Sequence, residues 1–127
     1  MVEKLQEERI LTKRELQEAI AREVGVFLIK NDCPVQYSGY PYLKESIVQA
    51  MLGLRGDSLV NRIIYMDIAK KYNTSVQNVE KCIRTIIDKW WRETKQQYLH
   101  TMFTARPTSK HLIAKCAECI SLNLHKT

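Results

Sequence analysis

Apolar residues recur at intervals of three and four along most of this chain, which is the spacing of one face of an α-helix. Only four Gly and three Pro interrupt the 127 residues, and such a scarcity of helix-breaking residues suits an all-helical protein. We therefore expect an all-α fold of about six helices in one compact domain, residues 1–127, with residues 1–15 as an N-terminal helical extension. The helices are predicted over about 4–30, 42–55, 59–71, 75–93, a short stretch from Tyr98, and a last helix from about Ser109.

Each predicted helix has one apolar face, and these faces together form the candidate core. A Gly-Asp-Ser corner at 56–58 is predicted to end the second helix and cap the third. The side chains expected to point inward are Leu16, Ile20, Val24, Phe27 and Leu28, then Leu43, Ile47, Ala50, Met51 and Leu54, then Val60, Ile63 and Ile64, and finally Leu112, Ile113, Cys116, Ala117, Ile120 and Leu124.

Two amphipathic patterns meet at a polar turn around residues 72–75. Ala69 is small enough for the two helices to touch, and Asn73 lies where the turn needs a residue that tolerates positive φ. Thr74 is predicted to be the N-cap of the second helix, with Gln77 three residues later completing a capping box. This arrangement indicates a helix-turn-helix, whose second helix typically reads DNA.

The second helix of this motif separates apolar from polar side chains strongly. At about 100° per residue, its apolar members fall on one narrow arc. They are Val76, Val79, Ile83, Ile86, Ile87 and Trp90. The opposite arc holds Gln77, Asn78, Lys81, Arg84, Thr85, Asp88, Lys89 and Arg92. Cations mixed with amides and hydroxyls suit a surface that faces phosphates and base edges. An ordinary helix with a solvated charged side remains the alternative.

The net charge of +6 is unevenly distributed along the chain. Residues 1–60 carry 8 Lys and Arg against 9 Asp and Glu, a net of −1, whereas residues 61–127 carry 12 against 5, a net of +7. The basic half contains the helix-turn-helix, so double-stranded DNA is the expected partner. Excess charge that serves only solubility is the competing explanation.

The sequence offers little for catalysis or metal binding. His111, Cys116, Cys119 and His125 have a spacing that could suggest zinc, but they fall within a continuous helical pattern, whereas structural zinc sites usually place a Cys pair on a turn. We see no catalytic motif, so we expect no enzyme activity, no cofactor, no metal and no small-molecule substrate. Without an N-terminal apolar segment or a run of about 18 apolar residues, a cytoplasmic protein with no membrane contact is expected.

The chain also resembles a known family, the C-terminal effector domain of the master response regulator that starts endospore formation in Bacillus and Clostridium relatives. The resemblance covers about residues 16–125. It rests on Pro34, Gly39, Tyr40, Tyr42, Leu43, Glu45, Tyr65, Asp67, Ile68, Ala69, Lys70, Lys71, Asn73, Thr74, Val79, Glu80, Ile83, Arg84, Ile87, Trp91, Pro107, Thr108, Ile113 and Ala114.

This resemblance implies a six-helix domain that reads the major groove and binds short DNA boxes as head-to-tail tandem copies. It places Glu80, Lys81 and Arg84 at bases, and Lys70, Lys71, Thr74 and Ser75 near phosphates. Combined with the helical face described above, the candidate base-reading residues are Gln77, Asn78, Glu80, Lys81, Arg84 and Thr85. The candidate phosphate-binding residues are Lys70, Lys71, Thr74, Ser75, Lys89 and Arg92.

The chain departs from the family pattern at several positions. Asn78 and Lys81 replace arginines and Thr85 replaces a histidine, which alters the expected DNA box. Met66 replaces a proline, so the third helix is expected to run on without a break. The family tryptophan aligns with Trp91, whereas the helical pattern buries Trp90. The resemblance also implies an N-terminal receiver domain, which these 127 residues do not include. Two interpretations stay open: an excised effector domain, or, as a second hypothesis on function, a receiver-less paralogue that binds proteins or antagonises a full-length regulator.

Overall fold

The computed structural model describes residues 12–53, 58–93 and 98–126, and all the regular structure in these residues is helical. This confirms the all-α class and the number of helices predicted. The helices are α2 (Lys13–Lys30), α3 (Gly39–Gly53), α4 (Ser58–Lys71), α5 (Val76–Glu93), α6 (Tyr98–Met102) and α7 (Ser109–Lys126).

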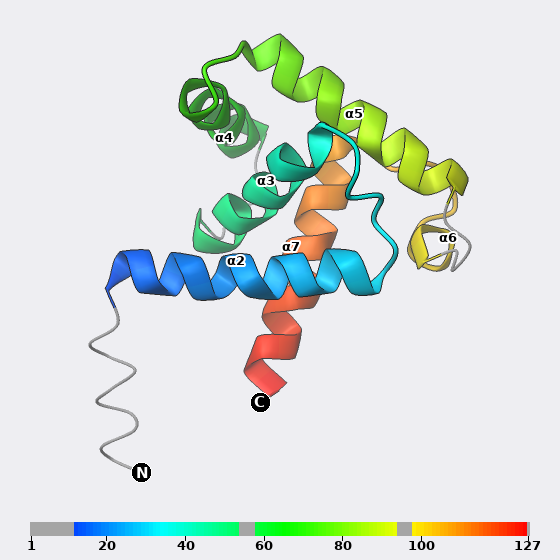
Figure 1. Ribbon diagram of the computed structural model, residues 1–127. Helices are drawn as coiled ribbons and strands as arrows, with labels where there is room; N and C mark the ends of the chain where they lie inside the picture. The colour runs from blue at the N-terminus through cyan, green and yellow to red at the C-terminus, as the bar shows by residue number, and fades with distance from the viewer. Residues whose placement is uncertain (1–11, 54–57, 94–97, 127) are drawn as a thin grey trace.

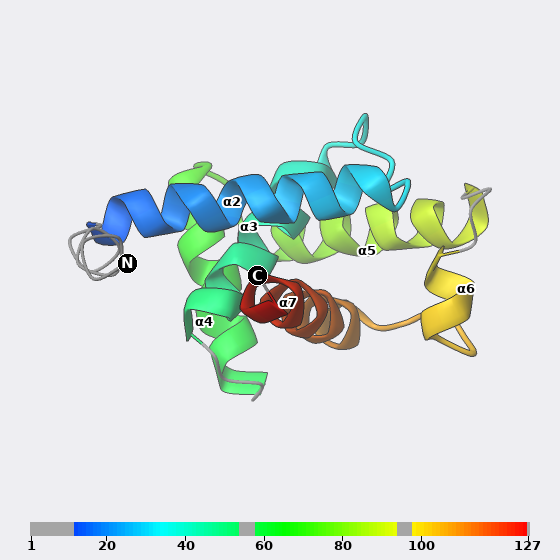
Figure 2. The same cartoon turned by 90° about the horizontal axis from the view of Figure 1, so that it is seen from below.

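Helix α3 lies at the centre of the fold and contacts α2, α4, α5 and α7. Figure 1 shows α2 crossing below α3, with α5 along the upper edge and α7 running down behind, and Figure 2 shows the same arrangement from below. Leu43 and Ile47 of α3 are fully buried, because they meet side chains from the surrounding helices. The hydrophobic core is thus organised around one central helix, and α5 covers one side of it.

Helix α2 has a well-defined start and end. Its N-cap is Thr12, which has extended backbone angles and whose hydroxyl accepts a 3.1 Å hydrogen bond from the amide of Glu15. The predicted start near residue 4 is therefore wrong for this helix, while residues 1–11 of the predicted extension lie outside the described residues. At the other end, Asp32 has a φ of 62°, and the amide of Cys33 donates to the carbonyl of Leu28, which forms a left-handed helix-ending motif.

Helix α3 begins three residues earlier than predicted, at Gly39 rather than Tyr42. Its first residue lies against a distant part of the chain. A Cβ atom at Gly39 would overlap the carbonyl oxygen of Cys82 in α5 and would lie 2.8 Å from the carbonyl carbon of that residue. Only a glycine lets the first turn of α3 approach the backbone of α5 this closely. The predicted Gly-Asp-Ser corner lies mostly in residues 54–57, outside the described residues, and α4 begins at Ser58.

The apolar face of α5 matches the prediction. Val79, Ile83, Ile86, Ile87 and Trp90 have no exposed surface, and Val76 packs against the core from a partly buried position.

The two tryptophans of α5 have different environments. Trp90 is fully buried and donates a 3.0 Å hydrogen bond from Nε1 to the carbonyl of Asn31, at the end of α2. Trp91 is partly buried and stacks on His100 of α6, with ring centroids 3.7 Å apart. The ring nitrogen Nε2 of His100 also lies 3.0 Å from the carbonyl oxygen of Trp91. Trp90 thus fixes α5 to α2, while Trp91 holds α6.

Some side chains predicted to point inward are partly exposed. The exposed fraction is 45% for Leu16, 50% for Ile63 and 39% for Leu124. Each of these residues lies near a helix end or on an outer face that no other described helix covers. Helix α4 runs without a break past Met66, as expected. Residues 104–108 form a connector before α7.

Candidate nucleic-acid interface

The turn between α4 and α5 is built by backbone hydrogen bonds around one left-handed residue. Asn73 has a φ of 54°, as predicted. Its amide donates to the carbonyl of Lys70 at 3.3 Å, and the amide of Thr74 donates to the carbonyl of Ala69 at 2.8 Å. These two bonds form a Schellman motif, which satisfies the last carbonyls of α4 and redirects the chain. Ala69 is buried where the two helices meet, which confirms its predicted role.

The N-cap of α5 is Ser75, and the prediction of Thr74 was wrong. The hydroxyl oxygen of Ser75 accepts a 3.0 Å hydrogen bond from the amide of Asn78, and its carbonyl accepts the amide of Val79 at 3.1 Å. The Thr74 hydroxyl instead accepts a 2.9 Å bond from the side-chain amide of Asn78. Gln77 is then one residue too early for the predicted capping box, so its side chain is not used to cap the helix.

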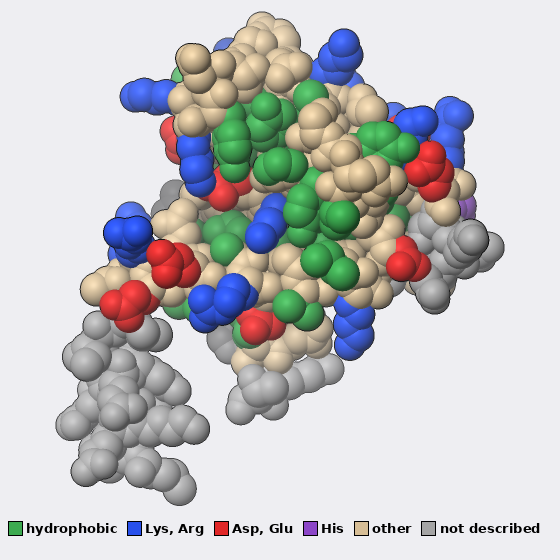
Figure 3. Space-filling model, in the orientation of Figure 1, with side chains coloured by type: hydrophobic (Ala, Val, Ile, Leu, Met, Phe, Trp, Pro, Cys, Tyr) green, Lys and Arg blue, Asp and Glu red, His purple; other side chains and the backbone are tan. Residues whose placement is uncertain are grey.

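The side of α5 opposite its buried stripe faces away from the other helices (Figure 1). Gln77, Lys81 and Arg84 are exposed there. Within the described part of the chain, no hydrogen bond or ion pair joins these three side chains to another group. Lys and Arg side chains also stand out along this upper edge in Figure 3. The amino-terminal half of α5 therefore presents positive charge and an amide without internal partners.

The other three candidate base-reading side chains lie at the margins or have internal bonds. Asn78 is half-buried. Its side-chain Nδ2 donates to Thr74, and its side-chain Oδ1 accepts a 3.7 Å hydrogen bond from the thiol of Cys82. Glu80 is half-buried on the side of α5 that faces α7. Thr85 is exposed, and its hydroxyl donates a 2.9 Å bond to the carbonyl of Lys81.

The two lysines at the end of α4 differ in their partners. Lys70 is exposed and has no ion pair among the described residues. Lys71 is also exposed, but its Nζ lies 3.1 Å from a carboxylate oxygen of Glu45 in α3 and 5.7 Å from the ring centre of Tyr72. The hydrogen bond to Glu45 raises the pKa of Lys71. Both lysines are exposed, but of the two only Lys71 has an ion pair with a described residue.

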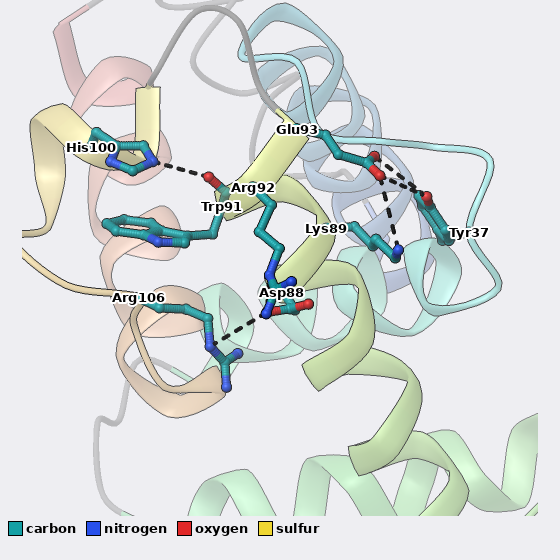
Figure 4. Close-up of polar contacts among 8 residues, drawn as sticks. All are labelled: Tyr37, Asp88, Lys89, Trp91, Arg92, Glu93, His100 and Arg106. Carbon is teal, nitrogen blue, oxygen red and sulfur yellow. Dashed lines mark hydrogen bonds and ion pairs between the residues drawn. The ribbon is translucent and has the colours of Figure 1, made fainter.

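The cations in the carboxyl-terminal half of α5 already have acidic partners (Figure 4). Lys89 is half-buried, 4.0 Å from Glu93 and 5.8 Å from the ring centre of Tyr37, which in turn donates to Glu93. Arg92 lies 3.2 Å from Asp88. Judged by the described residues, the α5 cations without an ion pair therefore lie in its amino-terminal half.

The structure also brings Arg106, from the connector before α7, within 3.9 Å of Asp88 (Figure 4). Arg106 is not among the candidate contacts predicted from the sequence. Arg106 contributes to the excess of positive charge in residues 61–127, which is the one sequence feature that points to it. The local sequence pattern does not show that the connector lies beside α5.

The described residues contain no group of three or more His, Cys, Asp or Glu side chains placed to hold a metal ion. Cys116 is buried within α7, and burial raises the pKa of its thiol above the ordinary value. Among the same residues, no helix combines the length and apolar character that crossing a membrane requires.

The comparison with known protein families agrees with this geometry. Residues 13–126 match the family described as the C-terminal domain of sporulation initiation factor Spo0A. The matched region runs from the first residue of α2 to the last residue of α7, so it includes every described helix. This family consists of DNA-binding effector domains that regulate transcription at the start of sporulation. The chain therefore belongs to the Spo0A C-terminal domain family.

Proposed function

We propose that this domain inserts α5 into the major groove of double-stranded DNA and reads a specific site with the outward side of that helix. The observation that carries this proposal is the difference between the two halves of α5. Lys81 and Arg84 are exposed and have no ion pair with a described carboxylate, whereas Lys89 and Arg92 are paired with acidic residues. An α-helix fits the major groove, and recognition helices contact bases mainly through their first turns.

The side chains available on α5 match different chemical features of base pairs. A guanidinium such as Arg84 can bond both acceptors of guanine, and an amide such as Gln77 can do the same for adenine. Lys81, at the middle of the exposed arc, suits a guanine acceptor as well. We expect Asn78, Glu80 and Thr85 to contribute less to base recognition. Asn78 and Thr85 have internal hydrogen bonds, and Glu80 lies at the margin of the face.

The phosphate contacts are proposed to gather around the start of α5. Lys70, Ser75 and Thr74 lie at or beside the turn, where the positive end of the helix dipole also favours an anion. Lys71 can join them by exchanging Glu45 for a phosphate. Lys89 and Arg92 are the weakest of the proposed phosphate contacts, because each must first give up a carboxylate.

Family membership further supports binding to tandem boxes as head-to-tail copies in the control of sporulation genes. We propose this mode of self-association for the present chain. It predicts that a duplex with two correctly spaced boxes retains the protein at lower concentration than two isolated boxes.

The test is to select bound duplexes from a random pool and then compare two variants on the best site. We expect Arg84→Ala to cost about 1–3 kcal/mol and to relax the preference at one base pair. Lys70→Ala should weaken binding to all sequences alike and reduce the slope of log affinity against log salt by about one. If both variants bind like the wild type, with unchanged base preference, α5 does not read the groove in this way.

A protein-interaction module is the second candidate function, and one observation favours it. Ile63 and Met66 keep 50% and 54% of their surface exposed on the outer side of α4. Retention on random DNA at two salt concentrations separates the candidates. A DNA reader should lose affinity steeply with added salt, whereas a protein binder should show little retention at either concentration.

A further inference from the structure

A cavity of about 330 Å³ lies beside α5, on the side that faces the amino-terminal end of α7. Arg84 and Glu80 of α5 form one wall, and Tyr65 of α4 contributes to the floor. The opposite wall comes from the connector and the start of α7, through Arg106 and Lys110. We call this cavity the α7 pocket. It is formed by three elements that are distant in sequence, so no local motif predicts it.

The α7 pocket is positively charged. It is lined by three cations, Arg84, Arg106 and Lys110, and by a single carboxylate, that of Glu80. Among the described residues, Arg84 and Lys110 have no ion pair. Arg106 approaches Asp88 at 3.9 Å, but Arg92 is closer to the same carboxylate, at 3.2 Å (Figure 4). Because one carboxylate faces two arginines, it only partly neutralises the charge of Arg106.

The pocket also contains hydroxyl groups that can bind the oxygens of an anion. Thr108 and Ser109 line it beside the cations. The Thr108 hydroxyl oxygen accepts a 3.2 Å bond from the amide of His111, which leaves its hydrogen available to donate. Burial raises the pKa of Tyr65, so its phenol stays protonated at neutral pH. Arginine, lysine and hydroxyl side chains are the groups that commonly contact DNA phosphates.

The location of the pocket indicates which anion it receives. Arg84 belongs both to the pocket and to the exposed side of α5. A helix in the major groove has a sugar-phosphate backbone along each flank. The α7 pocket lies on one flank of α5. We propose that it holds a phosphate of the DNA backbone, with Arg106 and Lys110 as contacts outside the helix-turn-helix. This inference rests on the proposed function, because it requires α5 to occupy the groove.

The experiment compares Arg106→Gln, Lys110→Gln and the double variant with wild type in the full chain. Glutamine keeps most of the side-chain length and removes the charge. Lys115→Gln is the matched control, because Lys115 is exposed on the same helix but does not line the pocket. Affinities for the selected site and for a random duplex are measured by fluorescence anisotropy at several salt concentrations.

We expect each single pocket variant to lose affinity equally for both duplexes. The slope of log affinity against log salt should fall by about 0.9 for each single variant and by about twice that amount for the double variant. The base preference and the control variant should stay as in wild type. The inference is overturned if the wild type binds its site with a steep salt slope and the double variant keeps the same slope and affinity. In that outcome the major-groove proposal survives. If the wild type shows no salt-dependent binding to any duplex, both proposals fail.

A second measurement distinguishes a DNA phosphate from a free one. Inorganic phosphate is titrated against the wild type and the double variant at constant ionic strength, and the thermal midpoint is followed. Saturable stabilisation of the wild type alone, combined with equal salt slopes on DNA, would assign the pocket to a free anion and overturn the inference. The thermal midpoints without phosphate also show that the variants are folded.

Discussion

Replacing Gly39 by alanine tests the contact that positions α5 against α3. The new Cβ would overlap the carbonyl oxygen of Cys82 and lie 3.2 Å from Cγ2 of Ile86. Both neighbours belong to α5, and the closest atom is backbone, which cannot rotate away as a flexible side chain can. The first turn of α3 and the middle of α5 must therefore move apart for the variant to fold.

The expected cost follows from two opposing effects. Overpacking a close contact typically costs about 1–3 kcal/mol, and a backbone clash belongs to the upper part of that range. Alanine recovers roughly 0.5–1 kcal/mol through its better helix propensity. The net loss in the free energy of unfolding should be about 2 kcal/mol, which for a domain of this size lowers Tm by roughly 6–10 °C.

The matched control is Gly53→Ala, because Gly53 lies in the same helix and an added Cβ there has no neighbour within 4 Å. This control should leave stability unchanged or raise it by up to about 1 kcal/mol. Urea unfolding followed by far-UV circular dichroism gives both values, and DNA affinity is measured below the transition. If Gly39→Ala is as stable as Gly53→Ala, the close approach of α3 to α5 is not a real constraint on the fold.

Three further predictions concern helix ends and buried groups. Ser75→Ala should cost about 1 kcal/mol, because it removes the N-cap of α5, and an unchanged urea midpoint would contradict the assignment. Trp90→Phe should cost about 1–3 kcal/mol, because it removes the hydrogen bond to Asn31 and some buried volume, and the same denaturation measures it. Burial raises the pKa of Cys33 from 9.0 to about 12, and it also raises that of Cys116. Because the thiols ionise at lower pH in the unfolded chain, they contribute fully to stability below pH 9.0, and this contribution is lost as pH rises towards about 12. The free energy of unfolding of the double variant Cys33→Ala/Cys116→Ala should therefore fall less steeply with pH over this range than that of the wild type.

The sequence predicts the helix-turn-helix well because its determinants are local. Asn73 takes the left-handed conformation at the turn, and the apolar stripe of α5 is buried as its spacing requires. The error at the N-cap is also local. Thr74 and Ser75 both have the chemistry of a cap, and the choice between them depends on where the Schellman motif ends α4.

The parts that the sequence could not predict depend on contacts between distant residues. Gly39, at the start of α3, lies against Cys82, which is 43 positions later in the sequence. The ion pairs of Lys71 with Glu45 and of Asp88 with Arg106 are likewise invisible in a helical wheel. A wheel finds which side chains face outward, but it does not show which of them already have partners from other helices.

Gln77, Lys81 and Arg84 have no hydrogen bond or ion pair with another described side chain, and this has a consequence for how the protein can diverge. Surface side chains without special contacts can usually be exchanged within about 0.5 kcal/mol of stability. Under the proposed function, substitutions at these three positions would therefore retarget the domain to a new operator while the scaffold stays intact. Divergence in operator preference among duplicated copies would need few mutations and no compensating changes in the core.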